Sequence, residues 1–115
     1  MNETFSRKNR LGGETFKVIR NGSRTISGCV HVYFRPGPGC RLAVVAGKKV
    51  GGSTRRNKLK RWAREIFRRN KDSLKNYDIV VIYKNGADRY TYGEIENILK
   101  KIWKRENLLK SQKES

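Results

Sequence analysis

The stretch KKVGGSTRRNKLKRWAREIFRRNK, residues 48–71, carries eleven Lys or Arg residues and a single acid, Glu65. Within it, apolar residues recur at the spacing i, i+3, i+4, i+7 and i+8, which places them on one face of a helix: Leu59, Trp62, Ala63, Ile66 and Phe67. The pattern predicts an amphipathic helix that starts at Ser53 or Thr54, either of which can cap it, after the flexible pair Gly51-Gly52. Its apolar face is expected to lie on the core.

The outward face of this helix is nearly all cationic. At about 100° per residue, a second row lies opposite the apolar one, with basic neighbours on both sides: Asn57, Arg61, Arg64 and Arg68, flanked by Lys58 and Lys60. Like charges at this spacing repel, and cations in the first turn oppose the helix dipole. A solvated surface is the ordinary explanation for a basic helix face, but the near absence of acids favours a bound polyanion.

The totals for the whole chain indicate the kind of partner. A chain of 115 residues is expected to form one small domain. It contains 28 Lys or Arg residues and has a formal net charge of +18, so its positive charges repel one another strongly. Nucleic acid is the partner that best neutralises them. A membrane surface is the lesser candidate. No apolar run approaches the roughly 20 residues of a membrane span, and the segment MNETFSRKNR has no apolar signal sequence, so we predict a cytoplasmic protein.

The residue types that catalysis requires are scarce. His31 is the only histidine and has no obvious carboxylate partner, so no catalytic residue is predicted in this chain. Cys29 and Cys40 flank a turn and could pair, although a reducing compartment favours two free, buried thiols. Together with His31 they cannot form a four-ligand metal site, and no protein-held metal is predicted.

The remaining segments predict an α+β sandwich of one domain with the order α-β-β-(β)-α-β-α. Residues 1–12 form a basic arm that docks Phe5 or Leu11, and residues 110–115 form a mobile tail. The helices are expected at 14–20, ended by Asn21-Gly22, at 53–71, and after the capping-box sequence TYGE at 91–94.

The strands are expected at 29–35, 41–47 and 78–83, with one or two short additions possible at 23–28 and a loop at 84–89. The turn RPGPG at 35–39 predicts that the first two strands form an antiparallel hairpin. The continuous apolar run DIVVIY is typical of a central strand covered on both faces.

Two aromatic residues are candidate platforms for unpaired bases, which stack on aromatic side chains beside a positive groove. Tyr33 lies on the strand face opposite Val30, Val32 and Phe34, together with His31. Phe16 lies on the first helix. Both could instead be core aromatics.

From Thr54 to Arg69 the sequence TRRNKLKRWAREIFRR resembles the signature of the bacterial ribonuclease P protein subunit, in which an Arg-Asn-Arg motif opens a helix. Lys58 stands where that family usually has the second Arg, which keeps the charge but loses the bidentate fork. Further counterparts follow in order along the chain: the arm SRKNRL at 6–11, the helix ending in Asn21-Gly22, the strand with Tyr33, the segment 47–51, and the DIVVIY strand.

The resemblance implies a small two-layer α/β sandwich like the second domain of ribosomal protein S5, with a left-handed βαβ crossover. It also implies that the protein binds a large catalytic RNA, as one copy per RNA, and assists that RNA in removing the 5′ leader from precursor tRNA. The RNA would hold the catalytic Mg²⁺. The helix facing the RNA corresponds here to eight residues: Arg55, Arg56, Asn57, Lys58, Lys60, Arg61, Arg64 and Arg68.

The resemblance further implies that a cleft between the first helix and the sheet holds the single-stranded leader. Its positions here are Phe16, Ile19 and Tyr33, with His31 beside Tyr33; Thr15 is an alternative to Phe16. A ribosomal type of RNA-binding protein would share the basic helix but lack the leader cleft. A DNA-binding regulator is disfavoured because the row of arginines contains only Asn57 as an amide reader.

Overall fold

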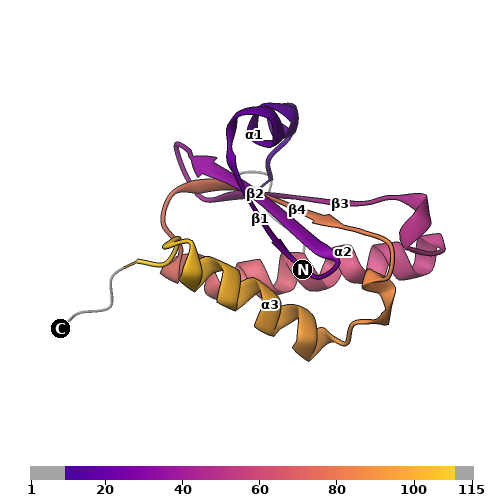
Figure 1. Cartoon of the computed structure of the whole chain (residues 1–115). Coiled ribbons are helices and arrows are strands. Elements are labelled where there is room, and N and C mark those ends of the chain that lie inside the picture. Colours follow the sequence, from indigo (N-terminus) through magenta and orange to yellow (C-terminus); the bar gives the residue numbers. More distant parts are fainter. Residues whose placement is uncertain (1–9, 111–115) are drawn as a thin grey trace, which may run out of the picture.

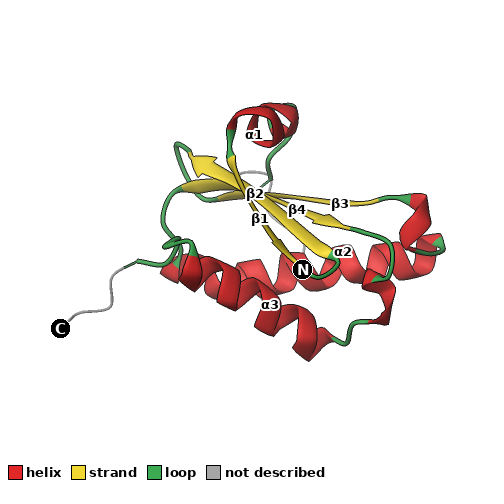
Figure 2. Cartoon of the chain, viewed as in Figure 1, coloured by secondary structure: helices red, strands yellow, loops and turns green. Residues whose placement is uncertain are grey.

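The computed structural model describes residues 10–110 as a four-stranded sheet with three α-helices (Figures 1 and 2). The elements are α1 (Thr15–Asn21), β1 (Ser23–Ser27), β2 (Val30–Pro36), β3 (Arg41–Ala46), α2 (Ser53–Asn70), β4 (Tyr77–Tyr83) and α3 (Tyr92–Arg105). The predicted α+β class and order are confirmed, including the additional strand within 23–28. Most of the predicted arm, with Phe5, and residues 111–115 of the predicted tail lie outside the described residues.

The sheet has the strand order β1-β2-β4-β3. Strand β2 pairs antiparallel with β1 and β4, whereas β3 pairs with β4 in parallel. The predicted antiparallel hairpin between residues 29–35 and 41–47 is therefore wrong, because β4 lies between these two strands. A connection with prolines at positions 36 and 38 does not supply the tight primed turn that a two-residue hairpin requires.

The reason for this insertion lies in the composition of β4. Its residues Ile79, Val80 and Val81 are completely buried, so the strand needs neighbours on both edges and cover on both faces, as predicted for DIVVIY. The parallel neighbours β3 and β4 are joined through α2, which makes a βαβ crossover. The handedness of this crossover stays a prediction.

Helices cover the two faces of the sheet unequally. Figure 1 shows α2 and α3 beneath the sheet and α1 above it. The main core lies under the sheet, where Val30, Val32 and Phe34 of β2 meet the apolar faces of α2 and α3. A smaller cluster of Leu11, Val18 and Val80 lies between α1 and the upper face. The short α1 leaves part of that upper face open.

The predicted end of α1 at Asn21-Gly22 and the predicted start of α2 at Ser53 are confirmed. Thr91 and Glu94 form the predicted capping box of α3. The N-cap of α2 is Gly52 and no side chain caps it, so the prediction that Ser53 or Thr54 caps this helix is wrong. Gly22 ends α1 in an extended conformation; a Cβ there would meet Phe34 O and Val18 O at 2.6 Å, so close approach, not a left-handed turn, requires glycine.

Both cysteines are free, as predicted, with Cys40 buried and Cys29 half-buried. Burial raises the pKa of the Cys40 thiol. The predicted loop at 84–89 contains a short 3₁₀ helix at Ala87–Arg89. No helix among residues 10–110 is both long and apolar enough to cross a membrane.

Candidate nucleic-acid interface

The basic face of α2 is open to solvent. Leu59, Ala63, Ile66 and Phe67 are buried in the core, and the predicted row on the opposite side is exposed: Asn57, Arg61, Arg64 and Arg68. No ion pair joins Arg61, Arg64 or Arg68 to a carboxylate in the part of the chain that the structure describes. These three guanidinium groups keep their hydrogen-bonding capacity for a partner.

The other predicted RNA-binding residues make contacts within the protein. Arg55 donates to Asp88 at 2.9 Å, which ties the start of α2 to the 3₁₀ helix. Arg56 Nε donates to Gly51 O at 3.1 Å, and the Lys58 ammonium lies 5.0 Å from the centre of the Trp62 ring. Lys60 is half-buried. These contacts order the first turns of the basic face rather than neutralise it, because Asp88 is their only carboxylate.

The upper face of the sheet carries the residues predicted for a leader cleft. The strand register places Ile26, His31, Ile82 and Val45 side by side in one row across the four strands. Ile26 and Val45 are exposed, and His31 and Ile82 are half-buried, so α1 does not cover this row. The result is a partly apolar strip of sheet beside a helix.

His31 is part of this strip, and the other predicted cleft residues lie on the α1 side of it. Tyr33 lies one row nearer to α1 and packs, like Ile19, against the small upper cluster. Phe16 is 76% exposed on α1, so the alternative that it is a core aromatic is wrong. Thr15 is the predicted alternative to Phe16 as a cleft residue. Its hydroxyl donates to Leu11 O and Gly12 O at the start of α1, so it is already used within the protein.

Cations surround the strip. Burial, followed by repulsion from Lys84 and Arg24, lowers the pKa of His31, so its imidazole stays neutral at pH 7. Beyond Ile82, a cavity of about 410 Å³ opens at the ends of β3 and β4. Its lining combines apolar side chains with exposed lysines: Val45, Val50, Ile82 and Tyr83, with Lys48, Lys49 and Lys84. An apolar surface edged by positive charge suits bases with their phosphates.

One residue that the sequence did not single out fixes α1 over the sheet. Arg41, at the start of β3, donates to both carboxylate oxygens of Asp78 at 2.9 Å and to Glu14 at 2.7 Å. Asp78 is buried on β4, and Glu14 is the N-cap position of α1. The hydrogen bond from Arg41 lowers the pKa of Glu14. Parallel pairing of β3 with β4 would have indicated this contact, since it places Arg41 beside Asp78.

The two surfaces meet around the edge of β3. This strand contributes Ala43 and Val45 to the upper face, packs against α2 below, and leads directly into the basic helix. A small α+β protein with a polycationic helix face next to an open sheet face with aromatic side chains is a nucleic-acid-binding protein by class.

Comparison with known proteins defines the class more narrowly. Residues 5–107 match the family described as Ribonuclease P. The chain is 39% identical over 115 residues to the ribonuclease P protein component of Thermotoga maritima, covering 89% of this chain and 98% of that protein. It is 38% identical over 107 residues to the same component of Pseudoalteromonas atlantica, covering 89% of each.

Solved structures agree with the sequence matches. The RNase P protein of Thermotoga maritima superimposes with a TM-score of 0.76 at 36% identity, over 84% of this chain and 96% of that one. The protein from Staphylococcus aureus gives a TM-score of 0.79 at 26% identity, over 88% and 95%. The chain belongs to the bacterial ribonuclease P protein family, which confirms the resemblance carried by residues 54–69.

Proposed function

We propose that this chain is the protein subunit of ribonuclease P, bound as one copy to a large catalytic RNA, and that it assists the RNA in removing the 5′ leader of precursor tRNA. The catalytic groups and the catalytic Mg²⁺ belong to the RNA in this proposal. Within residues 10–110, no three His, Cys, Asp or Glu side chains gather closely enough to hold a metal ion. The contribution of the protein is affinity and positioning.

The exposed row on α2 is the observation that carries the proposal. Arg61, Arg64 and Arg68 project from a rigid helix, and like-charge repulsion along this row is relieved when phosphates lie between the guanidinium groups. The surrounding residues extend the same face toward the helix start: Arg55, Arg56, Asn57, Lys58 and Lys60. We assign this face to the catalytic RNA.

The upper face of the sheet is assigned to the leader. In this proposal a single-stranded segment lies on the strip that contains His31, beside α1, with bases able to stack on Phe16 and Tyr33. Ile19 supplies an apolar wall. Because the strip and α2 meet at the edge of β3, one protein molecule can hold the leader while it remains bound to the RNA.

Reconstitution tests this function. The purified chain is added to a bacterial ribonuclease P RNA at a Mg²⁺ concentration too low for the RNA to cleave precursor tRNA efficiently alone. We expect cleavage to be restored. RNA binding without stimulated cleavage would instead support the ribosomal type of RNA-binding protein.

The two surfaces are tested separately. Arg61→Ala combined with Arg64→Ala should weaken RNA binding and flatten its salt dependence, whereas Lys101→Ala with Lys104→Ala, an equal loss of charge on α3, should change it less. Tyr33→Ala should weaken binding of precursor tRNA more than binding of mature tRNA. Equal losses for the two ligands would remove Tyr33 from the leader site.

A further inference from the structure

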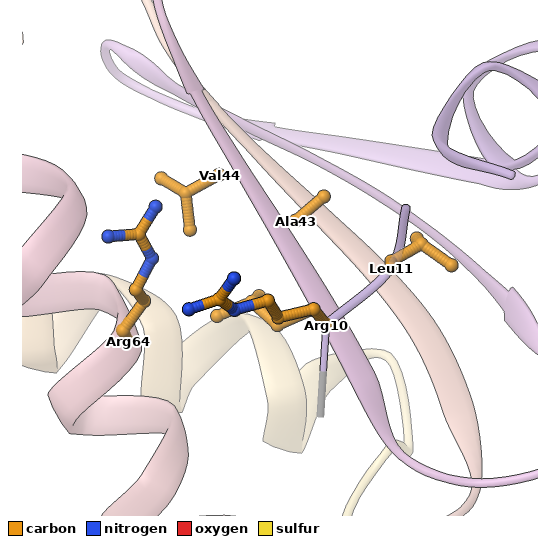
Figure 3. Close-up of a pocket in the computed structure, with 6 residues that line it drawn as sticks. Arg10, Leu11, Ala43, Val44 and Arg64 are labelled. Carbon is orange, nitrogen blue, oxygen red and sulfur yellow. The ribbon is translucent and has the colours of Figure 1, made fainter. Parts of the chain in front are cut away.

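Two arginines from distant parts of the chain line one pocket at the edge of β3 that faces away from β4. A pocket of about 280 Å³ is lined by Arg10, Leu11, Leu42, Ala43, Val44 and Arg64. Figure 3 shows the side chain of Arg10, from the N-terminal arm, extending toward Arg64, whose side chain rises from α2 toward Val44. Arg10 lies outside the helix that the family resemblance assigns to RNA.

The pocket has the donors of an anion site and no acid in its lining. No ion pair joins Arg10 or Arg64 to a carboxylate of residues 10–110. Two guanidinium groups that converge on apolar walls repel each other unless an anion lies between them. Each presents a planar fork of N–H donors that matches phosphate oxygens.

The backbone adds a third donor. Leu11 N–H donates to Leu42 O at 2.9 Å, so the peptide groups of Leu42 point to the edge of β3 that faces away from β4, where the N-terminal arm joins the strand. Strand alternation directs the N–H of Val44 to the same edge. In a continued parallel ladder the carbonyl of Leu11 would accept this N–H of Val44. Here the carbonyl of Leu11 instead accepts a hydrogen bond from the hydroxyl of Thr15.

We propose that Arg10 and Arg64 clamp one backbone phosphate of the catalytic RNA at the edge of β3, with Arg10 as a binding residue in addition to the α2 face. This inference rests on the proposed function. The clamp lies where the RNA-binding helix passes to the leader strip, since Ala43 belongs to the upper face and Arg64 to α2. A phosphate held there fixes the RNA backbone relative to the leader.

The distinctive consequence is that two arginines neutralise one phosphate. Binding of ribonuclease P RNA is measured over a range of monovalent salt for the wild type, Arg10→Gln, Arg64→Gln and the double variant. We expect each single variant to bind roughly tenfold more weakly and the double variant little more so, because the second substitution acts on a contact already lost. Independent contacts would multiply to roughly a hundredfold.

The salt dependence gives a second readout. Log affinity falls with log salt by about 0.7–0.9 per neutralised phosphate. The double variant should therefore lose about one such increment from the slope, and the control Lys101→Gln none. Arg10→Lys and Arg64→Lys retain the charge without the fork, and should recover only part of the affinity. The clamp would be refuted if the slope of the double variant fell by two increments and the affinity losses of the two single variants multiplied. It would also be refuted if neither the slope nor the affinity changed.

Free phosphate is the competing source of the same chemistry. Thermal unfolding in sodium phosphate is compared with unfolding in sodium chloride at equal ionic strength. A phosphate-specific stabilisation that the double variant lacks, combined with an unchanged RNA salt slope, would assign the pocket to the free ion and refute the RNA clamp. Circular dichroism of each variant checks that the fold is intact. If the wild-type chain stimulates cleavage but the two arginines act independently, only the clamp proposal is refuted. If the wild-type chain does not stimulate cleavage, the proposed function itself is refuted.

Discussion

Replacing Arg41 by glutamine removes the only side chain among residues 10–110 that donates hydrogen bonds to the buried carboxylate of Asp78. The side chain of Asp78 is 2% exposed and receives two hydrogen bonds from Arg41, which is itself 22% exposed. Breaking a fully buried ion pair by removing one member costs about 3–5 kcal/mol, because the other charge is left without compensation. Since Arg41 reaches solvent, which screens the pair, we expect a loss in the free energy of unfolding of about 2–3 kcal/mol.

Urea denaturation followed by circular dichroism measures this loss, and an unchanged m-value would show that only stability changed. Glu14→Gln removes the exposed partner of the same arginine and should cost much less. Arg41→Met combined with Asp78→Leu removes both charges and should be more stable than Arg41→Gln. Arg41→Gln with a stability equal to that of Glu14→Gln would refute the reasoning that the buried carboxylate drives the effect.

Three further predictions follow from single positions. Phe16→Ala should leave stability unchanged, because the ring is 76% exposed. If one base of the leader stacks on the ring, the substitution should weaken the binding of precursor tRNA by about 1–3 kcal/mol and leave the binding of mature tRNA unchanged. Equilibrium binding measurements with both tRNAs test this. Gly22→Ala should destabilise by roughly 1–3 kcal/mol, whereas Gly39→Ala, which meets nothing within 4 Å, should not; thermal unfolding compares them. The lowered pKa of His31 means that the unfolded chain binds its proton more readily, so wild-type stability should fall as pH drops below about 6.5. His31→Gln should lose less stability over the same range, and identical urea midpoints at each pH would contradict this.

The sequence was sufficient for features that depend on local periodicity. The 3.6-residue pattern placed Leu59, Ala63 and Ile66 in the core and left the arginine row outside, as observed. The run of β-branched residues in DIVVIY predicted a strand covered on both faces. The capping box at Thr91 and Glu94 was equally local.

Features set by long-range pairing were not accessible in the same way. The strong turn at 35–39 indicated a hairpin, yet two strands close in sequence are separated by β4, because a strand that is apolar on both faces is best covered in the middle of the sheet. The Arg41–Asp78 pair depends on that parallel register. The presence of Arg10 and Arg64 in one pocket depends on where the arm joins the edge of β3. No spacing in the sequence encodes these approaches.

The position of β4 in the middle of the sheet has a consequence during synthesis. As the ribosome releases the chain, β1, β2 and β3 emerge before the strand that must sit between the second and third of them. The sheet therefore cannot close until residue 83 has left the exit tunnel, by which time the whole positively charged helix is already outside. We expect the nascent protein to meet cellular polyanions while it is still unfolded.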